Sequence, residues 1–134
     1  MPKKLSVVLV DDSKIVIAQL LKLIAGVDGV EAIGTAGDGS GAVRVVGELR
    51  PDLVVMDIMM PGMDGMSALR VLRSNYPEVR VVMASSVAGM SSRAEEAFRL
   101  GAIQVIGKPF DHELLTSLFE AERAARQETA GETP

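Results

Sequence analysis

Hydrophobic residues in this chain follow two alternating patterns: short unbroken runs, and longer segments with helical spacing. The short runs, rich in β-branched residues, predict strands covered on both faces, near residues 5–10, 30–35, 52–57, 80–85 and 103–107. The longer segments carry apolar positions at the spacing of amphipathic helices, at residues 14–25, 39–49, 64–75, 90–100 and 111–127. This alternation predicts an α/β fold, a doubly wound parallel sheet of five strands with right-handed crossovers.

Local signals support two of the helix boundaries. Ser13 has the hydroxyl side chain expected at the cap of the first helix, and Gly101 follows the fourth helix where glycine tolerates a left-handed backbone. The 134 residues, 48% of them hydrophobic, suffice for one core. We therefore expect one domain over residues 1–127 and a polar, disordered tail over residues 128–134.

Composition excludes several classes of protein. A net charge of −4 gives no sign of a nucleic-acid surface, and the absence of cysteine excludes disulfides and thiolate metal sites. The apolar runs are too short for a membrane span, and residues 1–4 are too few for a signal peptide. We expect a soluble cytoplasmic protein that binds neither nucleic acid nor membrane.

Polar residues stand where four of the predicted strands end. Asp57 closes the third strand, Asp11 and Asp12 follow the first, Ser85 ends the fourth, and Lys108 ends the fifth. The carboxyl ends of parallel strands share one edge of the sheet, where α/β proteins bind ligands. Asp57 taken alone could equally be a helix cap, but its agreement with the other strand ends favours a binding site.

The side chains at this edge suit phosphoryl transfer. Three carboxylates repel one another unless a cation is present, and Mg²⁺ binds one or two carboxylates together with a phosphate. Lys108 supplies a positive charge for a phosphoryl oxygen, and Ser85 supplies a hydroxyl donor. Catalysis of phosphoryl transfer consists mostly of positioning and charge neutralisation, which such a set provides.

Other candidate signals are weaker. The glycine-rich segment 34–41 lacks the spacing of a nucleotide-binding loop and follows the second strand, so it predicts a turn. His112, the only histidine, lies in a helix start and is expected in solvent. The methionine run predicts core and loop packing rather than a soft-metal site, since it lacks Cys or His nearby; its members are Met56, Met59, Met60, Met63 and Met66.

In combination, these motifs resemble a known family. Over residues 5 to about 125 the chain is similar to the receiver domains of bacterial two-component response regulators, in particular the single-domain chemotaxis type; the matching segments are Val10–Ser13, Asp57–Gly65, Met83–Ser86 and Gly107–Phe110. The resemblance implies a flavodoxin-like fold with strand order 2-1-3-4-5.

The resemblance also implies a reaction. Asp57 would accept a phosphoryl group from a phosphohistidine on a sensor histidine kinase or a histidine phosphotransfer protein. Asp12, Asp57 and the backbone carbonyl of Met59 would hold Mg²⁺, and Asp11 would act through water. The protein would catalyse its own phosphotransfer and dephosphorylation and would otherwise not be an enzyme.

The same resemblance assigns the switch. Lys108 would bind a phosphoryl oxygen, and its peptide bond to Pro109 would be cis. Ser85 would be the hydroxyl that moves toward the phosphoryl group; Ser86 is adjacent, but Ser85 directly ends the strand. Partner binding would change on the face formed by the last two helices and the last strand, for an output protein that the sequence does not identify.

Two positions depart from the family pattern. Val105 stands where the family often has an aromatic residue that rotates with the switch hydroxyl, so the switch must work without a large ring. Met59 replaces a frequent polar side chain two residues after the phosphorylated aspartate. We expect the apolar side chains of Met59 and Val87 to flank the approach of water and to slow loss of the phosphoryl group.

One alternative remains open, and two others lack residues that they would need. The chain could be the receiver of a larger regulator with a DNA-binding or methylesterase output, because residues 91–100 and the Ser85–Ser86 pair are similar to chemotaxis methylesterases. An aspartate-nucleophile phosphatase would need a second acid at the position of Met59. A flavodoxin-like cofactor binder would need a phosphate loop where the acidic pair Asp11–Asp12 stands.

Overall fold

The computed structural model describes residues 3–86 and 90–132. Five strands alternate with five helices over this part of the chain. The strands are β1 (Leu5–Val10), β2 (Val30–Ala36), β3 (Leu53–Asp57), β4 (Arg80–Ser86) and β5 (Gln104–Lys108). The helices are α1 (Lys14–Ala25), α2 (Gly39–Leu49), α3 (Gly65–Asn75), α4 (Met90–Arg99) and α5 (His112–Glu132).

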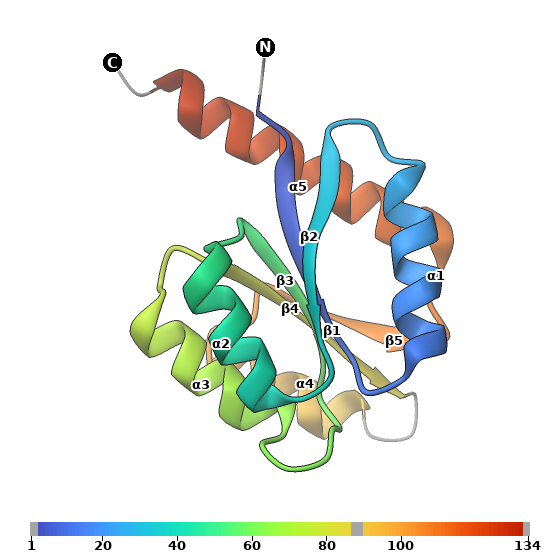
Figure 1. The fold of residues 1–134 in the computed structure, drawn as a ribbon, viewed down its shortest axis with the longest axis vertical. Coiled ribbons are helices and arrows are strands. Elements are labelled where there is room, and N and C mark those ends of the chain that lie inside the picture. Colours follow the sequence, from blue (N-terminus) through green and yellow to red (C-terminus); the bar gives the residue numbers. More distant parts are fainter. Residues whose placement is uncertain (1–2, 87–89, 133–134) are drawn as a thin grey trace.

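The strands form one parallel sheet in the order β2-β1-β3-β4-β5. The α/β class, the parallel sheet and the strand order are therefore confirmed. Because β3 lies in the centre of the sheet, with β1 on one side and β4 on the other, its carboxyl end is flanked by the ends of both neighbours (Figure 1).

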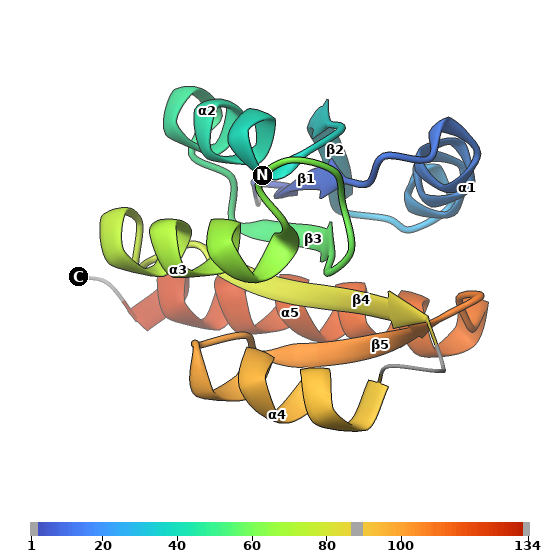
Figure 2. The same cartoon turned by 90° about the horizontal axis from the view of Figure 1, so that it is seen from below.

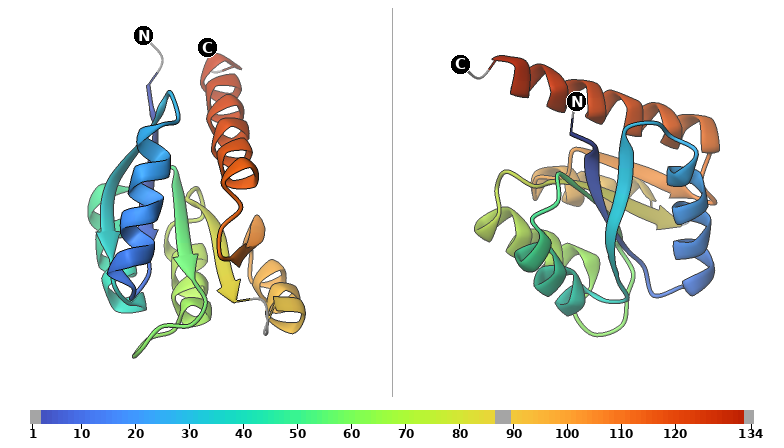
Figure 3. Two further views of the ribbon diagram at one scale, coloured as in Figure 1. Left: turned by 90° about the vertical axis from the view of Figure 1, so that its right-hand side faces the viewer. Right: turned by 45° about the horizontal axis from the view of Figure 1, so that its top comes forward.

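Helices cover both faces of the sheet (Figure 2). A separate hydrophobic cluster of buried side chains lies beneath each helix layer. Helices α1 and α5 pack on one face, where Phe119 and Leu115 of α5 are almost fully buried with Leu20 and Ile24 of α1. Helices α2, α3 and α4 cover the other face (Figure 3). The sheet is buried on both sides, which explains the continuous apolar runs of its strands.

Side chains at the helix starts fix where several helices begin. The Ser13 hydroxyl accepts a hydrogen bond from the backbone N–H of Val16 at 3.3 Å, which confirms the predicted cap. Asp38 and Asp64 cap α2 and α3 in the same way. Gly101 has a φ of +107°, as expected for the glycine that follows α4.

Helix α5 differs most from the expected boundaries. We expected it to end at residue 127, but it continues to Glu132. The added residues include alanine and glutamate, which favour helices, and the first glycine in α5 is Gly131. The residues of the expected tail are therefore helical up to Glu132. Among the described residues, no helix combines the length and apolar character needed to cross a lipid bilayer.

Candidate functional site

Four charged side chains meet at the carboxyl edge of the sheet. Asp11 and Asp12 follow β1, Asp57 is the last residue of β3, and Lys108 is the last residue of β5. Asp57 pairs with Ala84 across β3 and β4, and the Ile58 N–H donates to the Ala84 carbonyl at 2.9 Å. The predicted convergence of these strand ends is therefore present.

Lys108 bridges two of the carboxylates. Its ammonium nitrogen lies 2.5 Å from Oδ2 of Asp11 and 3.0 Å from Oδ2 of Asp57. Both aspartates are buried, with 4% and 7% of their surfaces exposed. Buried charges are costly unless they are paired and hydrogen-bonded, and Lys108 supplies that pairing for both.

Backbone N–H groups hold the remaining oxygens of the buried pair. Oδ1 of Asp11 accepts from the Ser13 N–H at 2.9 Å, and Oδ1 of Asp57 accepts from the Met59 N–H at 3.3 Å. Each carboxylate is thus oriented by one backbone donor and by the ammonium of Lys108. The arrangement leaves two carboxylates on a single lysine.

Burial raises the pKa of Asp57, and the nearby charge of Asp11 raises it further, although the hydrogen bond and charge of Lys108 act in the opposite direction. The pKa of Lys108 is also raised: burial alone would lower it, but the hydrogen bonds and charges of Asp11 and Asp57 together outweigh burial. The folded protein thus favours the protonated form of Lys108 and disfavours the ionised form of Asp57, even though Lys108 is paired with it.

The loop after Asp57 is fixed at two points where glycine is required. The Gly65 N–H donates to the Ile58 carbonyl at 2.9 Å, and a Cβ on Gly65 would collide with the backbone oxygen of Asp57. The Gly39 N–H donates to the Met63 carbonyl at 3.0 Å, and a Cβ there would collide with that oxygen. Close backbone packing thus positions Asp57. The sequence indicated Gly65 only as part of a turn.

The donor set fits a hard divalent cation. Asp11, Asp12 and Asp57 each offer one carboxylate oxygen, and these oxygens lie within 4.8 Å of one another. Asp12 is exposed, while the other two are buried. An all-oxygen set with several negative charges and one solvent-facing member suits Mg²⁺, which retains several waters.

Ser85 lies beside the cluster but is not hydrogen-bonded to it. The side chain is buried, and its hydroxyl donates to the Ser86 carbonyl at 3.2 Å. Ser85 pairs with Gly107 across β4 and β5, one position beyond the pair that contains Asp57. Its hydroxyl would have to rotate to reach a group bound to Asp57.

Four further predictions concern neighbouring positions. The Lys108–Pro109 peptide bond is cis, as expected. Val105 is buried, with 8% of its surface exposed. Val87, expected to flank the approach of water, lies outside the described residues. His112 is exposed at the start of α5, as expected.

Met59 and Arg93 form a contact that the sequence did not predict. Met59 is 62% exposed, unlike its buried neighbour Met60. The Nη2 atom of Arg93, near the start of α4, lies 4.0 Å from the Met59 sulfur. Residues 59 and 93 belong to different βα units, so only the packing of α4 beside the β3–α3 loop brings them together.

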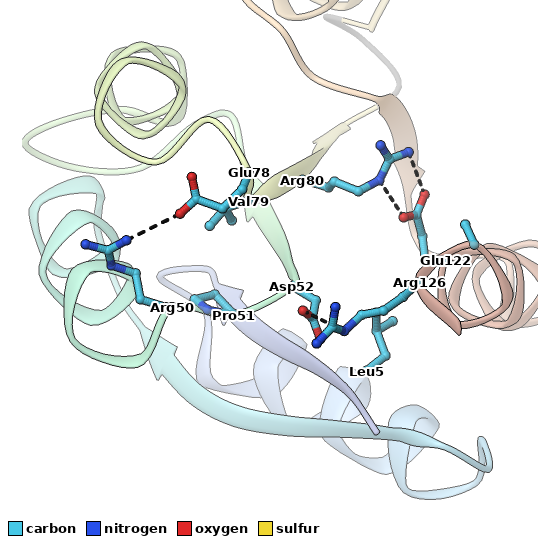
Figure 4. A pocket seen from close by; sticks show the side chains of 10 residues that line it. Leu5, Arg50, Pro51, Asp52, Glu78, Val79, Arg80, Glu122 and Arg126 are labelled. Carbon is cyan, nitrogen blue, oxygen red and sulfur yellow. Dashed lines mark hydrogen bonds and ion pairs between the residues drawn. The ribbon is translucent and has the colours of Figure 1, made fainter. Parts of the chain in front are cut away.

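The opposite edge of the sheet holds a separate cavity of about 340 Å³ (Figure 4). Three arginines line it, and each pairs with a carboxylate from another element. The pairs are Arg50 with Glu78, Arg80 with Glu122, and Arg126 with Asp52. These charges neutralise one another, and the pairs of Arg80 with Glu122 and of Arg126 with Asp52 tie α5 to the starts of β4 and β3.

Curated proteins of known class are similar to this chain in sequence. The chain is 39% identical over 103 residues to a protein-glutamate methylesterase/protein-glutamine glutaminase of Myxococcus xanthus, a match that covers 77% of this chain and 30% of that protein. The chain spans about a third of the length of the curated relatives it matches.

Solved structures of response regulator domains are also similar to this chain. The response regulator domain of Thermotoga maritima CheB superposes with a TM-score of 0.80 and 32% identity, over 92% of this chain and 96% of that one. A CheX-CheY-BeF3-Mg complex from Borrelia burgdorferi gives a TM-score of 0.80 and 30% identity, with 89% and 90% covered. The family model described as the response regulator receiver domain matches residues 7–120, and the chain belongs to that family of two-component signalling domains.

Proposed function

We propose that this receiver domain accepts a phosphoryl group on Asp57 in a Mg²⁺-dependent reaction, from a phosphohistidine on a sensor histidine kinase or a histidine phosphotransfer protein. The observation that carries the proposal is the bridge made by Lys108 between Asp11 and Asp57. It places a protonated amine against the acceptor carboxylate, where the transferred group would gain its negative charge.

The transfer needs little covalent chemistry from the protein. An oxygen of Asp57 attacks phosphorus, the bond from phosphorus to the imidazole nitrogen breaks, and its electron pair returns to the imidazole. Lys108 neutralises a phosphoryl oxygen, and the Met59 N–H holds the carboxylate in position. Mg²⁺, when bound by Asp12, Asp57 and the Met59 carbonyl, with Asp11 acting through water, would neutralise further charge on the phosphoryl oxygens.

Phosphorylation would then act as a switch. We infer that the Ser85 hydroxyl leaves the Ser86 carbonyl for a phosphoryl oxygen, and that this movement alters the face formed by α4, β5 and α5. Val105 stands in that strand in place of a large ring, so the change would pass through the loop after β4. In this proposal the domain is a cytoplasmic signalling switch that catalyses only its own phosphotransfer and dephosphorylation.

Acetyl phosphate provides a direct test. Incubation with acetyl phosphate and Mg²⁺ should add the mass of one phosphoryl group to the intact protein, and hydroxylamine should remove it, as expected of an acyl phosphate. Chelation of Mg²⁺ should prevent labelling. Asp57→Asn should abolish it, whereas full labelling of that variant would refute the assignment.

A second candidate concerns the output. The methylesterase relatives are roughly two and a half times as long as this chain, and their matched portion corresponds to this domain. We propose, as the alternative, that the domain regulates a methylesterase or DNA-binding module within a longer protein. The full reading frame decides between this arrangement and a stand-alone regulator.

A further inference from the structure

Arg93 is a cation near the phosphorylation site for which the proposed function supplies no role. Its Nη2 atom lies 4.0 Å from the sulfur of Met59. The backbone N–H of Met59 donates to Oδ1 of Asp57 at 3.3 Å. Only one residue therefore separates the residue that Arg93 contacts from the acceptor aspartate.

The contact with Met59 is a weak one for a guanidinium. A thioether sulfur is a poor hydrogen-bond acceptor, whereas a phosphoryl group accepts from the planar donors of arginine strongly and often in pairs. Within the described residues Arg93 forms no ion pair, in contrast to the arginines that do: Arg44, Arg50, Arg80 and Arg126. Moving its guanidinium from sulfur to a phosphoryl oxygen would thus break no strong contact.

The charges at the site favour such a movement. Three aspartates face one lysine, and Lys108 is already bound to two of them. Phosphorylation of Asp57 exchanges one negative charge for about two. Asp11, Asp12 and a phosphorylated Asp57 would together carry about four negative charges, whereas Lys108 and a divalent cation would supply three positive charges. About one negative charge would therefore remain without a partner at the site that Met59 adjoins.

We propose that Arg93 is a second cationic contact for the phosphoryl group on Asp57, and that its guanidinium leaves the Met59 sulfur for a phosphoryl oxygen once the group arrives. The inference rests on the proposed phosphorylation of Asp57 and adds a residue to it. Because Arg93 belongs to α4, the contact would connect the phosphoryl group to that helix directly, in addition to the connection through Ser85.

Beryllium fluoride with Mg²⁺, a mimic of the phosphoryl group, tests this contact without turnover. Its affinity is measured by titration calorimetry for wild type, Arg93→Gln and Arg93→Lys. Arg99→Gln is the matched control, since it removes the same charge from the exposed end of the same helix. Thermal unfolding without ligand confirms that all four proteins are folded.

Arg93→Gln should bind beryllium fluoride about three- to tenfold more weakly, as expected for one exposed charge-assisted contact, and with a smaller dependence on salt. Its affinity for Mg²⁺ alone should be unchanged, Arg93→Lys should recover part of the loss, and Arg99→Gln should match wild type. Equal affinities for wild type and Arg93→Gln, or equal losses in Arg93→Gln and Arg99→Gln, would overturn the inference. Wild type that neither binds the mimic nor is labelled by acetyl phosphate would instead refute the proposed function, and the role of Arg93 with it.

Discussion

The charge of Asp57 should lower the stability of the domain when Mg²⁺ is absent. Burial raises the pKa of Asp57, which means that the folded state disfavours its ionised form. Asp57→Asn removes the charge, keeps the shape and can still accept the hydrogen bond from Met59. We therefore expect the variant to be more stable than wild type at neutral pH without metal.

The expected gain in stability of Asp57→Asn follows from opposing electrostatic contributions. At an effective dielectric of 20, Asp11 within 4.8 Å repels Asp57 by at least about 3.5 kcal/mol, and Lys108 at 3.0 Å attracts it by about 5.5 kcal/mol. Desolvation of a buried carboxylate costs several kcal/mol and decides the sign. We expect a net gain on the order of 1 kcal/mol for Asp57→Asn, or about 4 °C in Tm for a domain of this size.

Mg²⁺ should make wild type more stable than Asp57→Asn, the reverse of the order without metal. A ligand at 100 times its Kd stabilises the folded state by about 2.7 kcal/mol, and the variant lacks one of the carboxylates proposed to bind the ion. Thermal unfolding with EDTA and with excess Mg²⁺ measures both effects. Asp28→Asn, at an exposed position in the turn after α1, is the control for loss of one negative charge.

The pH dependence gives the same prediction a second test. A carboxyl group whose folded pKa is raised destabilises the fold above that pKa, and the cost disappears as pH falls toward the ordinary value of 3.8. The advantage of Asp57→Asn should therefore shrink on acidification. A variant no more stable than wild type in EDTA, or stabilised equally by Mg²⁺, would refute this reasoning.

The remaining predictions concern labelling, metal binding and lifetime. Gly65→Ala should displace the backbone of Asp57 and reduce labelling by acetyl phosphate. Gly37→Ala, where a Cβ meets nothing within 4 Å, should leave labelling unchanged. Equal labelling of the two variants would show that the close approach of Gly65 to the Asp57 backbone is unimportant. Asp12→Ala should weaken Mg²⁺ binding in calorimetry, while Lys108→Ala should retain Mg²⁺ binding and lose the response to phosphorylation; a Lys108→Ala protein that still switches its partner binding would contradict the role of the lysine. Replacing Met59 with Asn and Val87 with Glu should speed loss of the phosphoryl group, because polar side chains orient the attacking water. The affinity for Mg²⁺ should change little. An unchanged half-life would show that water access past these two residues does not set the lifetime of the phosphoryl group.

The meeting of Asp11, Asp57 and Lys108 was predictable from the sequence because a parallel sheet brings the carboxyl ends of its strands to one edge. The apolar runs located those ends to within one or two residues, and the capping role of Ser13 followed from its position before a helical pattern. These features depend on periodicity and on local contacts, which a single sequence expresses well.

Other features depend on packing between distant segments. The contact of Arg93 with Met59 depends on how α4 packs beside the β3–α3 loop, and no local pattern encodes that distance. The hydrogen bond from the Ser85 hydroxyl to the Ser86 carbonyl depends on the rotamer that Ser85 adopts at a buried strand end. The end of α5 was missed because residues 128–132 are polar, and polarity alone does not distinguish a solvated helix from a tail.

The identity of the phosphorylated residue is the central claim, and chemical mapping tests it most directly. The protein is labelled with acetyl phosphate and Mg²⁺ and reduced with borohydride, which converts an aspartyl phosphate to homoserine, and its peptides are sequenced by mass spectrometry. We predict homoserine at position 57 alone, and only in samples that contained Mg²⁺. Homoserine at position 11 or 12, or labelling without homoserine at position 57, would contradict this prediction.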